Sequence, residues 1–246
     1  MDRLHAAAIA IPGVEVRVVE RCSSTNDLLL REVPETPLLI AAEEQTAGRG
    51  RRGRRWHSAP GAGITFSLGR RIARSVRELA ALSLVAGVAT TRALRALGAH
   101  QAALKWPNDL VVDGAKLGGI LVETRSSHAV IGIGINCRSD ATVEARVGRR
   151  LAYLNSPVNR NEVIRRIAVA LVEAIDQFEK HGLDALRAEW EAMHAYAGQK
   201  LRVRLADGRT LSGTAAGLGA DGSLQLHTRQ GMRSVTSGRV VSARTA

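Results

Sequence analysis

The spacing of apolar residues predicts strands and helices over the first 197 residues and only short strands after them. Apolar runs and strict apolar–polar alternation are typical of strands, and they occur at residues 14–20, 37–43, 63–69, 101–106, 116–124 and 129–135. Longer apolar stretches, two of them opened by the capping patterns SxxE and NxxE, predict helices, at residues 75–98, 159–180 and 183–195.

The last part of the chain predicts a small β domain. Four short alternating runs follow residue 197, and the pairs Asp207-Gly208 and Asp221-Gly222 separate some of them. Asp-Gly pairs favour tight hairpins. The chain therefore reads as α+β, with a mixed sheet and helices over residues 1–197 and a barrel-like β domain over 198–246. About 50 residues are few for independent stability, so we expect the second domain to lean on the first.

Composition narrows the class of protein. The 246 residues carry a formal net charge of +12, which permits nucleic acids, acidic proteins or phosphorylated small molecules as partners. The cysteines Cys22 and Cys137 lie far apart and outside any CxxC spacing, which argues against a disulfide framework or a zinc site. The N-terminus has neither a signal-peptide pattern nor a membrane span. We therefore expect a cytoplasmic protein without membrane contact.

The most unusual stretch is GRGRRGRRW at residues 48–56, which holds three glycines and five arginines. Glycine lets the backbone approach a ligand, and arginine binds carboxylate and phosphate groups. The formal GxGxxG match fails as a dinucleotide fingerprint, because that motif needs a helix next and an acid about 20 residues on. Gly69, Arg70 and Arg71 stand there instead. A Walker A pattern is missing too, so a ligand loop and a solvated basic turn both stay open.

Two further patterns each allow a structural and a functional interpretation. Ser24, Thr25 and Asn26 precede an apolar run, where such residues either cap a helix or bind polar ligand groups. Gly132 and Gly134 alternate on one predicted strand and leave one face bare, for a flat ligand or for a bulge.

Cationic and donor groups gather at predicted strand ends and turns. A hairpin after residue 106 is expected to put Lys105 and Lys116 on adjacent strands. No Ser-His or Cys-His nucleophile pair accompanies them. Such residues would bind acids and phosphates and stabilise developing charge without becoming acylated, which suits activation of a carboxylate by ATP.

Four motifs carry a family resemblance: GRGRRGRxW at 48–56, KWPNDL at 105–110, KLGGILVE at 116–123 and GIGIN at 132–136. In this order, and preceded by the SSTN segment and Gln45, they resemble biotin–protein ligases over about residues 15–246. The resemblance implies a class II synthetase-like catalytic domain that binds biotin and ATP over residues 1–197. It also implies an SH3-like C-terminal domain over 198–246.

The resemblance implies an activity, a partner and roles for single residues. Enzymes of this family join biotin to ATP as biotinyl-5′-AMP and pass the biotinyl group to a lysine of a biotin carboxyl carrier protein of acetyl-CoA carboxylase. Lys105 and Arg51 would be catalytic, and Asn108 and Asp109 would help to hold Mg²⁺. The residues implied to bind biotin or nucleotide are Ser24, Thr25, Asn26, Gln45, Gly48, Arg49, Gly50, Arg51, Lys116, Gly118 and Asn136.

The chain departs from the family at three places, of which glycine at 118, where many members have alanine, is a mild change. About 14 residues precede the first predicted strand, so we expect a monofunctional ligase without specific DNA binding. Residues 138–154, where family members place an aromatic residue over the adenine, offer Arg149, Arg150, Leu151 and Tyr153. The resemblance also allows a weak homodimer through a sheet edge. The alternatives are a lipoate or octanoyl ligase of the same fold, and a nucleic-acid-binding module supported only by charge.

Overall fold

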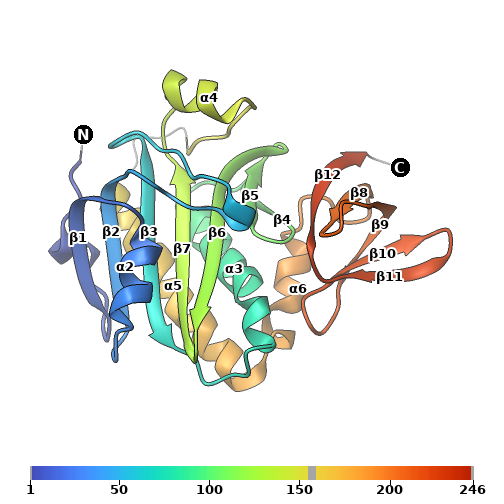
Figure 1. The fold of residues 1–246 in the computed structure, drawn as a ribbon, viewed down its shortest axis with the longest axis horizontal. Helices are drawn as coiled ribbons and strands as arrows, with labels where there is room; N and C mark the ends of the chain where they lie inside the picture. Colours follow the sequence, from blue (N-terminus) through green and yellow to red (C-terminus); the bar gives the residue numbers. More distant parts are fainter. Residues whose placement is uncertain (1, 155–158, 245–246) are drawn as a thin grey trace.

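The computed structural model describes residues 2–154 and 159–244, so Met1 and residues 245–246, the ends of the two predicted domain ranges, lie outside it. A seven-stranded mixed sheet dominates the first part (Figure 1), in the order β1-β2-β3-β7-β6-β5-β4. Only β1 and β2 pair in parallel. The strands are β1 (Glu15–Cys22), β2 (Leu38–Gln45), β3 (Gly63–Arg71), β4 (Ala103–Lys105), β5 (Asp109–Val112), β6 (Ala115–Arg125) and β7 (His128–Asn136).

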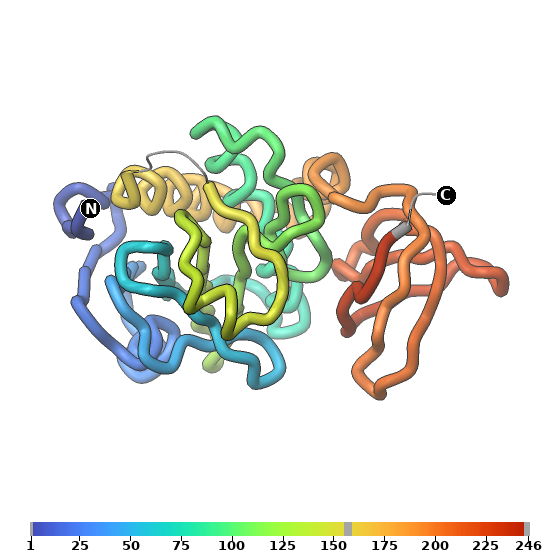
Figure 2. The backbone as a smooth tube through the Cα atoms, turned by 90° about the horizontal axis from the view of Figure 1, so that it is seen from above, coloured from blue at the N-terminus to red at the C-terminus, as the bar shows by residue number. Residues whose placement is uncertain are grey.

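Helices cover both faces of this sheet. Helices α3 and α5 pack on one face and α2 lies on the other, as the two perpendicular views show (Figures 1 and 2). The helices are α1 (Ala6–Ile9), α2 (Thr25–Glu32), α3 (Leu82–Ala96), α4 (Ala141–Val147), α5 (Arg160–His181) and α6 (Asp184–Ala192), with 3₁₀ turns η1 (Arg51–Gly53) and η2 (Glu78–Ala81). The segment Glu78–Ala96 is long and apolar enough to cross a membrane, but 72% of it is buried in the fold, as expected of a core helix.

Both predicted capping patterns are confirmed. Ser75 and Glu78 form a reciprocal pair, because the Ser75 hydroxyl donates to Glu78 at 2.7 Å and accepts from the Glu78 N–H at 3.4 Å. This pair opens the 3₁₀ turn η2, and the α-helix begins only at Leu82. The Asn159 side chain accepts the N–H groups of Asn161 and Glu162 and caps α5. Helix α4 lies where the sequence pattern is weak, and it was not predicted.

The predicted neighbourhood of Lys105 and Lys116 is wrong. Lys105 ends β4 and Lys116 lies in β6, but β5 runs between these two strands in the sheet. The bend after Trp106 turns the chain back sooner than expected, so Asp109 pairs with Lys105 and starts a strand of its own. Residues 109–112, which were expected to lead into a turn, thus form a strand of the sheet, β5.

A five-stranded antiparallel sheet forms the C-terminal part, in the order β11-β10-β9-β8-β12. Its strands are β8 (Lys200–Leu205), β9 (Thr210–Leu218), β10 (Leu224–Thr228), β11 (Gly231–Val235) and β12 (Gly238–Arg244), of which β11 was missed. It leans on the first part as expected: the Trp106 indole N–H donates to the Gly222 carbonyl at 3.1 Å, and Glu191 of α6 accepts the Leu218 N–H at 2.8 Å.

A buried arginine fastens the N-terminal segment to the sheet. Arg160, at the start of α5, is 2% exposed and forms ion pairs with Asp2 at 3.1 Å and with Glu43 of β2 at 2.8 Å. Glu43 also accepts the Leu4 N–H at 2.6 Å. One guanidinium therefore joins the N-terminus, α5 and the end of β2 that leads into the loop at 48–56.

We expect Arg160→Ala to lower the free energy of unfolding by about 3–5 kcal/mol, because it leaves two partly buried carboxylates without their cation. Urea denaturation measures this change. Arg165→Ala is the matched control on the same helix: Arg165 is 37% exposed and pairs with Glu162, so its loss should cost at most about 1 kcal/mol. Equal losses in the two variants would show that burial does not matter here.

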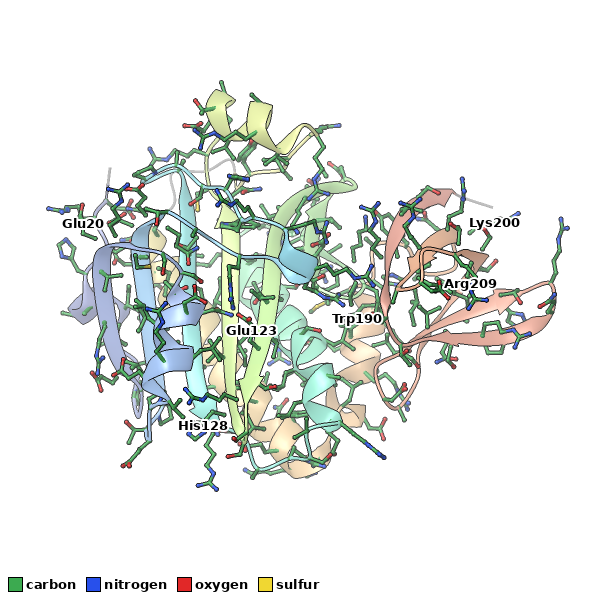
Figure 3. All side chains as sticks on the ribbon, viewed as in Figure 1. Glu20, Glu123, His128, Trp190, Lys200 and Arg209 are labelled. Atoms are coloured by element: carbon green, nitrogen blue, oxygen red, sulfur yellow. The ribbon has the colours of Figure 1, made fainter. Side chains whose placement is uncertain are left out.

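His194 is a second buried polar residue whose surroundings affect stability. It stacks on Trp190 of α6 with ring centroids 4.7 Å apart, and its Nε2 has no hydrogen-bond partner among the described residues. Trp190 lies between the larger part of the fold and the C-terminal sheet (Figure 3). Burial lowers the pKa of His194 to about 4.

Stability should therefore fall as the pH falls from about 6.5 to about 4, because in that window the unfolded chain protonates His194 and the folded chain does not. Over this window, His194→Leu should lose less stability than the wild-type protein, by up to about 3 kcal/mol. Urea unfolding at a series of pH values tests this. Parallel stability curves for the two proteins would contradict it.

Candidate functional site

A patch without side chains lies at the centre of the larger sheet. Gly119 of β6 pairs directly with Gly134 of β7, and Gly132 lies two residues along the same face. A Cβ on Gly134 would collide with the Trp56 indole, and one on Gly132 would collide with the Asn26 amide. The bare face predicted from the sequence is thus real, and the chain's own Trp56 and Asn26 occupy part of it.

A chain of hydrogen bonds crosses this face from β2 to β6. Gln45 Oε1 accepts the Thr25 N–H at 2.8 Å, and the Thr25 hydroxyl lies 2.6 Å from that of Ser67. Ser67 donates to Asn26 Oδ1 at 2.6 Å, and the Asn26 amide donates to Glu123 at 2.9 Å. The SSTN segment thus supplies two members of this chain of hydrogen bonds, Thr25 and Asn26.

The helix-capping interpretation of the SSTN segment is correct about where the helix begins, but not about the hydrogen bonds of the side chain. Ser24 is the N-cap residue of α2, but its side chain accepts no N–H group of the helix. Ser24, Thr25 and Asn26 are all buried. The Thr25 and Asn26 side chains face the sheet, where they fix the start of α2 above β3 and β6.

The loop at 48–56 folds over the same face. Gly50 N–H donates to the Arg54 carbonyl at 2.7 Å, and Trp56 N–H donates to Gly48 at 2.9 Å, so the loop closes on itself. Arg52 adopts a positive φ of 58° at its tip. The turn brings Trp56 back onto the glycine patch.

Arg49 ties this loop to the sheet and to α2. Its guanidinium forms ion pairs with Glu123 of β6 and, at 3.0 Å, with Asp27 of α2. Glu123 lies on the central strands, on the face that the loop crosses (Figure 3). Neither acidic partner was singled out from the sequence, because their role depends on a contact between distant segments.

The loop, α2 and the strands β3, β6 and β7 border a cavity of about 900 Å³, a volume that includes open solvent at its mouth. Phe66, Ile120, Ile133 and the Trp56 ring supply apolar wall. Of the predicted site residues, its lining includes Ser24, Thr25, Asn26, Gln45, Arg49, Gly50, Arg51, Asn108, Lys116 and Asn136.

A second cavity adjoins the first and is strongly cationic. It shares Arg51, Arg54, Asn108 and Arg149 with the first cavity. Its other lining residues are Arg52, Lys105, Trp106, Pro107, Asp109, Gly238, Arg239 and Val240, the last three from β12. Among the lining residues of this cavity, Asp109 is the one acid, and it accepts a hydrogen bond from Lys116.

Two of the predicted binding residues line neither cavity. Gly48 packs against the Trp56 backbone, where a Cβ would lie 2.7 Å from the Trp56 carbonyl. A Cβ on Gly118 would lie 2.7 Å from the Gly134 carbonyl and 2.9 Å from Leu110. The neighbour Gly119 lines the first cavity instead. Both predicted glycines keep the backbone close-packed behind the site.

The segment after α4 forms the remaining wall. Its Leu151 bridges to Lys116, and the Asn136 amide donates to the Lys116 carbonyl at 3.1 Å. Val147, Arg149 and Leu151 face the first cavity, whereas Tyr153 donates its hydroxyl to Glu144 at 2.5 Å. Val147 and Leu151, and not the ring of Tyr153, therefore supply the apolar surface at this end.

Electrostatics favour an anion between the two lysines. Burial lowers the pKa of Lys105, a shift that Asp109 partly offsets and that Arg149, Lys116 and Arg239 increase. Burial also lowers the pKa of Lys116. Several cations held close together with few carboxylates can accept a polyanion, which would relieve their mutual repulsion.

Comparison with known proteins agrees with this geometry. Residues 18–140 match the biotin/lipoate A/B protein ligase family, and residues 197–241 match the biotin protein ligase C terminal domain. The chain belongs to the biotin/lipoate A/B protein ligase family. It is 32% identical to the bifunctional ligase/repressor BirA of Escherichia coli, over 96% of this chain and 76% of that protein. It is 33% identical to the biotin–[acetyl-CoA-carboxylase] ligase of Mycobacterium tuberculosis, over 94% of this chain and 90% of that enzyme.

Solved structures confirm the predicted fold class. The biotin protein ligase from Aquifex aeolicus in complex with biotin and ATP superimposes with a TM-score of 0.81 at 25% identity, over 94% of this chain and 99% of that one. The Helicobacter pylori biotin acetyl coenzyme A carboxylase synthetase with bound biotinylated ATP has a TM-score of 0.68 at 26% identity, over 90% of this chain and 99% of that one.

We expect Glu123→Gln to loosen the loop at 48–56, because the substitution removes one of the two carboxylate charges that hold Arg49. Loss of up to about 1 kcal/mol should raise the rate of tryptic cleavage within the loop by up to about fivefold. Mass spectrometry of limited digests measures this rate. Glu144→Gln, which removes a charge beside Tyr153, is the control and should not change it; equal cleavage in all three proteins would sink the idea.

Proposed function

We propose that this protein is a biotin–[acetyl-CoA-carboxylase] ligase, which adenylates biotin and transfers it to a lysine of a biotin carboxyl carrier protein. One observation carries the proposal: a partly apolar cavity adjoins a cationic one, and Arg51, Asn108 and Arg149 border both. A hydrophobic acid and a polyphosphate can therefore lie end to end. The match of residues 197–241 to the biotin-type C-terminal domain favours biotin over lipoate.

The first step joins the two substrates. A biotin carboxylate oxygen attacks the α-phosphorus of ATP, the bond to pyrophosphate breaks, and biotinyl-5′-AMP forms. In our proposal the ring system of biotin lies on the glycine patch beside Trp56, within reach of Ser24, Thr25 and Gln45. Its carboxylate then points towards Lys116 and Arg51. Val147 and Leu151 supply the apolar cover for the adenine near Asn136.

Lys105 and Arg51 stabilise the charge that develops on the phosphates. Both border the cationic cavity, and burial there makes their charges act through less water than at the surface. Neither needs to gain or lose a proton. Gly48, Arg49, Gly50 and Gly118 would act indirectly, by shaping or holding the loop and strands around the ligand.

Asn108 and Asp109 suit a magnesium ion that is bound mainly through phosphates. Mg²⁺ takes few protein oxygens in such sites, and these two side chains supply an amide and a carboxylate oxygen at the cationic cavity. Among the described residues, no group of three or more His, Cys, Asp and Glu side chains could hold a metal alone. Held by Asn108 and Asp109, the ion would reduce the negative charge of the phosphates in the first step.

The second step needs only that biotinyl-5′-AMP stays bound and that the carrier lysine can reach it. The ε-amine of the carrier lysine attacks the acyl carbon of biotinyl-5′-AMP, and AMP leaves. The closed loop shields this mixed anhydride from water until the carrier arrives. The division at residue 197, the cytoplasmic location, the weak homodimer and the lack of specific DNA binding stay predictions.

Incubation with ATP, Mg²⁺, biotin and a carrier domain, followed by mass measurement of the carrier, tests the function. We expect one biotinyl group per carrier domain, and none with lipoate in place of biotin. Titration calorimetry with each acid gives the binding preference independently. Tighter binding of lipoate, with its transfer to a carrier, would overturn the proposal in favour of the alternative.

Lys105→Ala should slow pyrophosphate release at least about a hundredfold. Biotin affinity should change little, because the charge acts as the transition state develops. Lys200→Ala is the control, since it removes an exposed lysine of β8 and should leave the rate unchanged. An unaltered rate in Lys105→Ala would remove Lys105 from the chemistry.

A further inference from the structure

The segment that connects α6 to the C-terminal sheet runs beside the end of β4. Leu104 N–H donates to the Met193 carbonyl at 2.8 Å, and Ala195 N–H donates to the Leu104 carbonyl at 2.8 Å. His194 forms a parallel bridge with Leu104. The connecting segment thus extends the larger sheet past its last named strand and fixes the residues on either side of Leu104.

This pairing brings one aromatic ring to Lys105. The Lys105 ammonium lies 5.9 Å from the centre of the Tyr196 ring, within the range of a cation–π interaction. In the part of the chain that the structure describes, Lys105 Nζ makes no hydrogen bond or ion pair. The Tyr196 ring is thus the partner that the structure gives the Lys105 ammonium in that part of the chain.

We propose that Tyr196 is a positioning residue for Lys105: its ring face orients and stabilises the ammonium that faces the phosphates of the substrate. The proposal rests on the biotin–protein ligase function described above. It also gives the connecting segment a part in the first chemical step, although Tyr196 lines neither cavity.

Charge around Lys105 explains why such a contact matters. Asp109 of β5 is the acid that favours its charged form, whereas Lys116 of β6, Arg149 and Arg239 of β12 oppose it. Asp109 already accepts a hydrogen bond from Lys116. The electron-rich face of an aromatic ring stabilises a cation without adding a full negative charge that would compete with phosphate.

The Tyr196 ring is itself held from several sides. Tyr196 is partly buried and packs against the main hydrophobic core. His194 meets the ring edge-on, with centroids 6.2 Å apart. Since the ring is fixed by packing rather than by its hydroxyl, phenylalanine should replace it and leucine should not.

The test compares Tyr196→Phe, which keeps the ring, with Tyr196→Leu, which keeps only apolar bulk. Single-turnover formation of biotinyl-5′-AMP is measured against pH, with biotin affinity measured in parallel. Tyr196→Phe should stay within about twofold of the wild-type rate. Tyr196→Leu should be slower by about five- to thirtyfold, the range expected for loss of a partly desolvated cation–π contact, and should bind biotin unchanged.

A second readout does not need activity. Lysines are reductively methylated with ¹³C, the Lys105 signal is assigned with Lys105→Arg, and its titration is followed by NMR. The pKa of Lys105 should fall in Tyr196→Leu, because the charged form loses its partner, and the alkaline limb of the rate profile should move to lower pH with it. Tyr196→Phe should leave both nearly unchanged.

Trp190→Phe serves as the structural control, since Trp190 is buried against His194. It should lower the melting temperature without moving the Lys105 titration. If Tyr196→Leu is slow but leaves the titration and the alkaline limb unmoved, or if Tyr196→Phe is as slow as Tyr196→Leu, the proposal is wrong. If the titration moves as expected but the wild-type protein makes no biotinyl-5′-AMP, the contact stands and the proposed function fails instead.

Discussion

The absence of side chains at the centre of the larger sheet determines the shape of the site. Because Gly119 and Gly134 face each other across β6 and β7, the Trp56 indole can lie directly on the backbone. Trp56 is the last residue of the Gly/Arg loop, so the space left by the missing side chains also determines the position of the loop. A single methyl group at Gly134 would displace the indole, and with it the wall between ligand and solvent.

Two classes of cation follow from this placement. Arg49 is matched by Asp27 and Glu123, so its charge holds the loop to the sheet. Around Lys105 and Arg149 the cations outnumber the acids, so their charge is available to a polyanion. The net charge of +12 therefore does not by itself indicate nucleic acid. Within the site, some of the positive charges are paired with carboxylates and hold the structure together, and others can be neutralised by phosphates.

Local patterns in the sequence predicted most strands, both capping pairs and the bare face of β7, because periodicity and capping act over a few residues. They failed where the outcome depended on contacts between distant segments. The strand β5 is too short to show a period, and the order β6-β5-β4 follows from pairing rather than from spacing. In the same way, Gly118 and Gly119 look alike in sequence, and only the register of β6 decides which of them faces the cavity.

The KWPND segment explains why the C-terminal sheet belongs to the site and is more than an appendage. Trp106 donates its indole N–H to Gly222 of the C-terminal part, and Arg239 of β12 lines the cationic cavity. Lys105, one residue before Trp106, contacts the ring of Tyr196. The KWPND segment thus contacts both sheets. The cationic cavity is therefore lined by residues of both sheets, since Lys105 belongs to β4 and Arg239 to β12.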